Sequence, residues 1–88
     1  MKTILPVAIT LVPDQRLLLP AGAEVLSVTA DDGDICLNVL ADLSEPTIEN
    51  RILVIPDHGQ IGDTLLAIFV CSFRPIPHGA FYHLFLTD

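Results

Sequence analysis

The sequence predicts an all-β protein, a compact small sandwich or barrel of about seven short antiparallel strands. Short runs rich in Val, Ile, Leu, Phe and Thr alternate with clusters of turn residues along the whole chain. No segment carries a long apolar stripe with the helical period. Because no linker or repeat interrupts this pattern, residues 1–88 are expected to form a single β domain.

The first two strands are expected at residues 3–10 and 16–20. Pro6 lies inside the first of them and marks it as an edge or bulged strand, because proline cannot donate to a central ladder. The residues "VPDQ" at 12–15 form the turn, since the fixed φ of proline suits a turn.

The next two strands form the most strongly predicted element, a hairpin of residues 24–30 and 35–42 around "DDGD". Asp32-Gly33 is the favoured pair for a tight turn that needs positive φ. Alternation places Ile35, Leu37, Val39 and Ala41 on one face of the second strand. The same rule groups Val25, Ser27 and Thr29 on one face of the first strand.

The second half of the chain is expected to add three strands. Residues 43–50 are interpreted as a loop, with a helical turn beginning near Ser44, and residues 51–55 as a strand. Residues 64–73 are expected to be a long buried strand, joined by the proline-rich "RPIPHG" to a last strand at 80–86.

The charge balance argues against nucleic-acid binding. Eleven acidic residues against four basic ones give a net charge of −7. A protein that follows a phosphate backbone needs clustered basic residues, whereas Lys2, Arg16, Arg51 and Arg74 are scattered.

The high apolar content predicts a homo-oligomer. The chain is 51% hydrophobic, with a mean hydropathy of +0.60, and a small domain has a thin core in which to bury these residues. The longest apolar run is far too short to cross a membrane, and prolines interrupt the apolar N-terminal segment that a signal peptide would require. Cys36 and Cys71 lie in apolar runs and are interpreted as buried thiols, which favours the reducing cytoplasm.

Neither a metal, a cofactor nor catalysis is expected. His58, His78 and His83 match no compact ligand spacing, and the acids of "DDGD" are explained by the turn. A nucleophilic triad could be drawn from Ser27, Ser44 or Ser72 with a histidine and an aspartate, but only geometry identifies a triad. A hydrolase that uses His58 with Asp57 or Asp63 is the minority alternative.

The stretch "DHGQIG" at 57–62 raises a choice between a simple turn and a ligand-binding loop. Its two glycines would allow close backbone approach, and its amides could bind an anion. Elsewhere, basic side chains and aromatic rings could supply contacts to phosphate and to a base. The candidate ligand-binding residues are His58, Gly59, Gly62, Arg74, His78, Phe81, Tyr82 and Arg51.

The order of several motifs resembles a family of short, uncharacterised bacteriophage proteins. The motifs are "MKTI", "LPAGAEVLSV" (19–28), "CL" (36–37), "PTIENRILVI" (46–55) and "HGQI" (58–61). This family often has a tryptophan after the "CL" pair and a fuller glycine-rich loop, and the present chain has neither.

The resemblance implies a phage accessory protein that acts in the cytoplasm of an infected bacterium. It further implies a counter-defence role, in which the protein binds and sequesters a nucleotide-derived immune signal of the ADP-ribose or cyclic-nucleotide type without catalysis. The alternatives are an acidic inhibitor that binds a host defence protein, and a structural or assembly protein of the phage.

Overall fold

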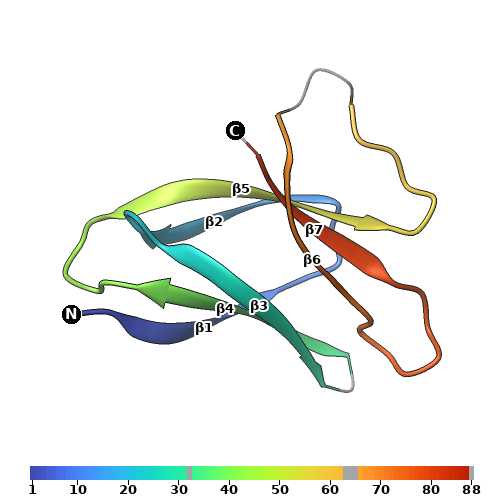
Figure 1. The fold of residues 1–88 in the computed structure, drawn as a ribbon, viewed down its shortest axis with the longest axis horizontal. Coiled ribbons are helices and arrows are strands. Elements are labelled where there is room, and N and C mark those ends of the chain that lie inside the picture. The colour runs from blue at the N-terminus through green and yellow to red at the C-terminus, as the bar shows by residue number, and fades with distance from the viewer. Residues whose placement is uncertain (32, 63–65, 88) are drawn as a thin grey trace.

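The described part of the chain consists of seven strands in two antiparallel sheets, which confirms the predicted all-β sandwich (Figure 1). This computed structural model describes residues 1–31, 33–62 and 66–87. The strands are β1 (Thr3–Ile9), β2 (Asp14–Pro20), β3 (Glu24–Asp31), β4 (Asp34–Ala41), β5 (Thr47–Pro56), β6 (Ile68–Phe73) and β7 (Tyr82–Thr87).

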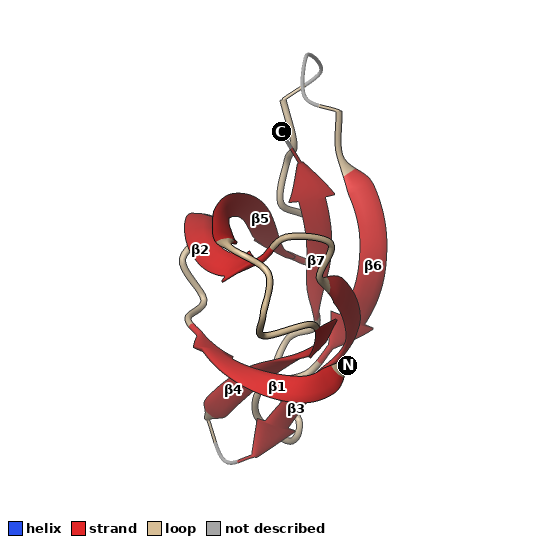
Figure 2. Cartoon of the chain, turned by 90° about the vertical axis from the view of Figure 1, so that its left-hand side faces the viewer, coloured by secondary structure: helices blue, strands red, loops and turns tan. Residues whose placement is uncertain are grey.

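One sheet has the strand order β1-β4-β3 and the other has the order β2-β5-β7-β6. Figure 2 shows them as two layers, with the three-stranded sheet below the strands β2, β5 and β7. The shortest dimension of the molecule is 16 Å, as expected for two sheets packed face to face. The layers also approach each other along β3 and β6, which are edge strands of the two sheets.

The core lies between the sheets and is built from alternate residues of each strand. In β4 the four residues predicted to share one face are all buried, so this is the face that packs on the core. Opposite them lie Ile52 and Val54 of β5 and Leu84 of β7, all fully buried. No polar side chain among the described residues is buried, so apolar burial and the strand ladders stabilise the sandwich.

The predicted alternation of β3 is wrong beyond its second residue, because a bulge falls between Val25 and Ser27. The extra residue puts Val25 and Val28 against the core and turns Ser27 and Thr29 outward. On the outer face Asn38 Nδ2 donates to Ser27 Oγ at 3.1 Å and to Thr29 Oγ1 at 2.7 Å. The sequence gives no local signal for this bulge.

The loop predicted at residues 43–50 is wrong in its second half, since β5 begins at Thr47. Residues 47–50 pair with Leu17–Pro20 of β2, and Arg16 forms an ion pair with Glu49 across the two strands. The helical turn expected near Ser44 is replaced by an Asp42 turn, in which Ser44 N donates to Asp42 Oδ1 at 3.0 Å.

The predicted long buried strand at 64–73 is shorter and more exposed than expected. Within the described residues it begins at Ile68, while residues 64 and 65 lie outside them. Because β6 is an edge strand, Ile68 remains 69% exposed and Phe69 56% exposed. The last strand begins at Tyr82 instead of residue 80, because the connection from β6 extends through Phe81.

The connection from β5 to β6 determines how the candidate site forms. Both strands pair antiparallel to β7, which lies between them, so β5 and β6 run in the same direction. The chain must therefore pass from one end of β7 to the other between Pro56 and Ile68. Its first residues fold onto the outer face of the sheet, the face that carries Ile55 and His83.

Among the described residues there is no helix with the length and apolar character needed to cross a membrane.

Candidate functional site

The predicted loop at 57–62 and the β6–β7 connection meet at one end of the four-stranded sheet. Pro56 and Phe73 both pair with Tyr82, the first residue of β7. One step beyond this pairing, Asp57 N donates to Phe81 O at 3.1 Å. We call the residues 57–59 and 74–81 that surround this bond the Arg74 corner.

Two similar turns shape the Arg74 corner, and each places a histidine in the left-handed region. In the first, Gly59 N donates to Pro56 O at 2.9 Å, and His58 has a φ of 66°. In the second, Gly79 N donates to Ile76 O at 2.9 Å, and His78 has a φ of 64°. A positive φ at the third residue is typical of a type II turn, and both histidines are exposed.

Gly59 is required by close packing and not by an unusual φ. A Cβ at this position would lie 2.5 Å from Ile55 Cγ2 and 2.9 Å from Pro56 O. Its amide already donates within the turn, so Gly59 contributes shape to the corner. Gly62 lies further along the crossover and is exposed.

Arg74 is the cation of the Arg74 corner. Its guanidinium carbon lies 4.1 Å from the centroid of the Phe81 ring, a cation–π geometry that orients the group. Both residues are exposed. None of the acidic side chains in the described part of the chain forms an ion pair with Arg74, so its charge is not neutralised there.

Two of the predicted binding residues lie away from this corner. Tyr82 points into the sandwich, where its ring stacks on Phe73 with centroids 6.0 Å apart. Arg51 pairs with Thr87 at the opposite end of β7 and contacts Asp14. Sequence reasoning could not separate these two residues from the others, because the separation depends on strand register.

Arg51 of β5 and Asp14 of β2 form a bidentate ion pair. Arg51 Nε donates to Asp14 Oδ1 at 2.9 Å and Arg51 Nη2 donates to Oδ2 at 2.6 Å. The hydrogen bond from Arg51 lowers the pKa of Asp14, and the same bond raises the pKa of Arg51. The geometry therefore supports a structural role for this arginine.

Two side chains on the outer face of the sheet, Ser72 and His83, form a continuous hydrogen-bonded chain with Asp57 of the Arg74 corner. Ser72 Oγ lies 2.7 Å from His83 Nδ1, and His83 Nε2 lies 2.7 Å from Asp57 Oδ1. Sequence reasoning named Ser72 only as one of several serines, and His83 only as one of three histidines that match no ligand spacing. The grouping depends on the β6–β7 register and on the crossover, so no local motif could have revealed it.

The alternative hypothesis of a hydrolase paired His58 with Asp57 or Asp63. Asp57 forms its hydrogen bond with His83, while Asp63 lies outside the described residues. The expectation of a protein without catalysis stays a prediction, to be tested by the chemistry of Ser72.

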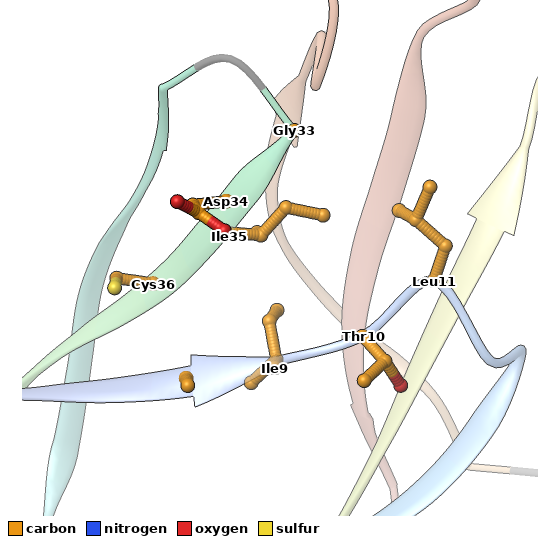
Figure 3. A pocket seen from close by; sticks show the side chains of 8 residues that line it. Ile9, Thr10, Leu11, Gly33, Asp34, Ile35 and Cys36 are labelled. Carbon is orange, nitrogen blue, oxygen red and sulfur yellow. The ribbon is translucent and has the colours of Figure 1, made fainter.

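A hollow of about 630 Å³ lies elsewhere, between the end of β1 and the start of β4 (Figure 3). In Figure 3 the Ile35 side chain extends toward the side on which Ile9 and Leu11 lie, whereas the Asp34 carboxylate extends to the other side. The hollow is lined by Ala8, Ile9, Thr10, Leu11, Gly33, Asp34, Ile35 and Cys36. Without a basic residue this hollow is unsuited to a phosphate group.

Comparisons with protein-family models, with curated proteins and with solved structures found no match to this chain.

Proposed function

We propose that the protein binds a small, anionic, nucleotide-like ligand at the Arg74 corner and does not transform it. The observation that carries this proposal is the position of the Arg74 guanidinium, 4.1 Å above the Phe81 ring, without a carboxylate partner among the described residues. A guanidinium that is already oriented loses little freedom when it binds a phosphate through two parallel hydrogen bonds.

The neighbouring groups match the other parts of a nucleotide. Phe81 is 40% exposed, so part of its ring is available to stack on a base. His58 and His78 lie in the two exposed turns of the Arg74 corner, and their ring nitrogens can bond ribose or phosphate oxygens. The net charge of −7 acts against anion binding over the surface as a whole, so attraction has to come from this local arrangement.

The proposed biological role is sequestration of the ligand that binds at the Arg74 corner. The resemblance to short phage proteins supports a counter-defence function, in which the protein sequesters an ADP-ribose-type or cyclic-nucleotide signal in the infected bacterial cytoplasm. Sequestration requires tight binding and no chemical step, which is consistent with a site built from one cation, one ring and turn residues.

A homo-oligomer is the proposed assembly, with β6 as the contact strand. Ile68 and Phe69 are more than half exposed on this sheet edge, and an exposed apolar edge readily pairs with a second copy. Light scattering coupled to size exclusion tests this, with Phe69→Lys expected to yield monomers. Leu18→Lys, on the opposite edge and 70% exposed, is the matched control. A monomeric parent protein would contradict the proposal.

Binding is best measured by titration calorimetry together with amide chemical shifts. ADP-ribose and a cyclic dinucleotide are the test ligands, and adenosine serves as the phosphate-free control. Arg74→Ala should raise Kd about 10- to 100-fold, since a hydrogen bond to a charged group contributes about 1.5–3 kcal/mol. Arg16→Ala removes an equal charge from an exposed position on β2 and should leave Kd unchanged. Equal effects of the two substitutions, or no binding by the parent protein, would refute the assignment of this corner.

A further inference from the structure

We propose that Ser72 is a nucleophile, that His83 is its general base, and that Asp57 positions the imidazole. The substrates would be small carboxylic esters that reach the outer face of the β6–β7 hairpin. This inference stands on the three side chains and goes beyond the binding function proposed above.

The strand register brings the serine and the histidine together. Ser72 and His83 are direct cross-strand partners on β6 and β7, so their side chains leave the same face of the sheet. Ile55 of β5 lies opposite His83 on its other side. The turn after β5 then folds back over Ile55 and places the Asp57 carboxylate against the far nitrogen of the imidazole.

The hydrogen bonds define which nitrogen of His83 holds the proton. A carboxylate can only accept, so His83 Nε2 carries the hydrogen that is donated to Asp57 Oδ1 at 2.7 Å. In the neutral imidazole, His83 Nδ1 then carries the lone pair. This nitrogen lies 2.7 Å from the Ser72 hydroxyl oxygen. This is the arrangement of a base–nucleophile pair with a third group that orients the base.

The site is accessible, as covalent chemistry requires. The His83 side chain is 31% exposed, the Asp57 side chain is 48% exposed, and Ser72 is exposed at the sheet edge. In a single copy of the chain, a substrate can therefore approach Ser72 Oγ from the outer face of the sheet without a movement of the strands.

The chemical step follows from these positions. Ser72 Oγ attacks the carbonyl carbon of the ester while its proton moves to His83 Nδ1, and Asp57 balances the charge of the imidazolium. When the tetrahedral intermediate collapses, the bond to the leaving oxygen breaks and that oxygen takes the proton from His83. Water then attacks the acyl-serine by the same route, which releases the carboxylic acid and restores Ser72.

Two other serines in the chain provide internal controls. Ser27 Oγ accepts a hydrogen bond from Asn38, and no basic side chain of the described residues is hydrogen-bonded to it. Ser44 Oγ donates to the Asp42 carboxylate at 2.6 Å, and a carboxylate is a weaker base than a neutral imidazole. Only Ser72 therefore pairs a hydroxyl with an imidazole in the described part of the chain.

Arg74 extends the inference to a preference for anionic esters, and this extension rests on the proposed binding site. It follows Ser72 by two residues at the end of the hairpin, and its guanidinium lies over Phe81, two residues before His83. A negatively charged group on the acyl side of an ester could bind Arg74 while the carbonyl lies at Ser72. Arg74→Ala should then slow the hydrolysis of anionic p-nitrophenyl hemisuccinate more than that of neutral p-nitrophenyl acetate, and equal effects on the two esters would refute this preference.

The decisive experiment is labelling of the folded parent protein with a fluorophosphonate probe. In this reaction the Ser72 Oγ–P bond forms, the P–F bond breaks, fluoride leaves and His83 takes the proton. Peptide mass spectrometry reads the rate at Ser72, Ser27 and Ser44 in one sample. Ser72 should be labelled at least about 100-fold faster than the other two, the lower end of a general-base contribution. Equal rates or no label at Ser72 would overturn the proposal.

Variants assign the roles of the other two groups, with circular dichroism as the check on folding. His83→Gln should reduce the rate of Ser72 labelling at least about 100-fold. Asp57→Asn should reduce it less, and should change the ¹⁵N signals of His83 because the hydrogen on Nε2 is no longer fixed. Selective labelling of Ser72 that survives in His83→Gln would remove the histidine from the mechanism. Because ADP-ribose binding does not require Ser72, calorimetry on Ser72→Ala separates failure of this inference from failure of the binding proposal.

Discussion

Gly59→Ala should destabilise the protein, because the turn that carries Asp57 and His58 has no space for a methyl group. The added Cβ would lie 2.5 Å from Ile55 Cγ2 and 2.9 Å from Pro56 O, well inside normal contact distances. One of these atoms is backbone and cannot rotate away, so the turn itself must shift. Overpacking of this kind costs about 1–3 kcal/mol.

Gly79 provides a matched control in the second turn of the same corner. A Cβ there would approach Ile76 O at 3.1 Å, with no contact below 3.0 Å, so Gly79→Ala should cost less than Gly59→Ala. Thermal unfolding followed by circular dichroism reads the difference, since each kcal/mol lowers the Tm of a domain of this size by about 4–8 °C.

A double variant tests whether the contact with Ile55 is the cause. Ile55→Leu removes the Cγ2 methyl, so Ile55→Leu/Gly59→Ala should lose less stability than the sum of the two single variants. Additive losses, or equal losses for Gly59→Ala and Gly79→Ala, would refute this reasoning about the turn.

Three further outcomes follow from the fold. Leu84→Ala removes a fully buried side chain and should cost about 2–5 kcal/mol in urea unfolding, whereas Leu18→Ala, at 70% exposure, should change stability by less than about 0.5 kcal/mol. The hydrogen bond from Arg51 lowers the pKa of Asp14 in the folded state, so this pair stabilises above the ordinary value of 3.8 and is lost as pH falls through the lowered value. Asp14→Asn should therefore reduce stability at neutral pH and show a smaller loss on acidification, and identical acid profiles would contradict the pairing. Burial raises the pKa of the Cys71 thiol, so iodoacetamide should modify it more slowly in the folded protein than in urea at the same pH, as mapped by peptide mass spectrometry.

Several features of this protein were predictable because they depend on residues close in sequence. The hairpin of β3 and β4 is confirmed in the described residues, with Asp31 opposite Asp34 and a φ of 91° at Gly33. Asp32, the other predicted turn residue, lies outside the described residues. The grouping of four apolar residues on one face of β4 and the edge position of β1, which contains Pro6, are also confirmed. Alternation and turn chemistry are local properties, so one chain suffices to read them.

Other features were decided only by contacts between distant segments. Residues 47–50 form a strand because they pair with β2. Strand β6 is an exposed edge because β7 lies between it and β5. The same long-range pairing grouped the predicted residues His58, Gly59, Arg74, His78 and Phe81 at one end of a sheet.

The sequence by itself determined that this chain forms strands, which residues of β4 share a face, and that few basic groups are available to any site. The tertiary structure alone decided that Ser72, His83 and Asp57 share one face, and that Arg51 lies at the other end of β7 from Asp57. The physical reason is register: a shift of one residue between β6 and β7 would turn one of the two side chains to the opposite face. That register is fixed by the packing of both sheets, which no single segment of the sequence encodes.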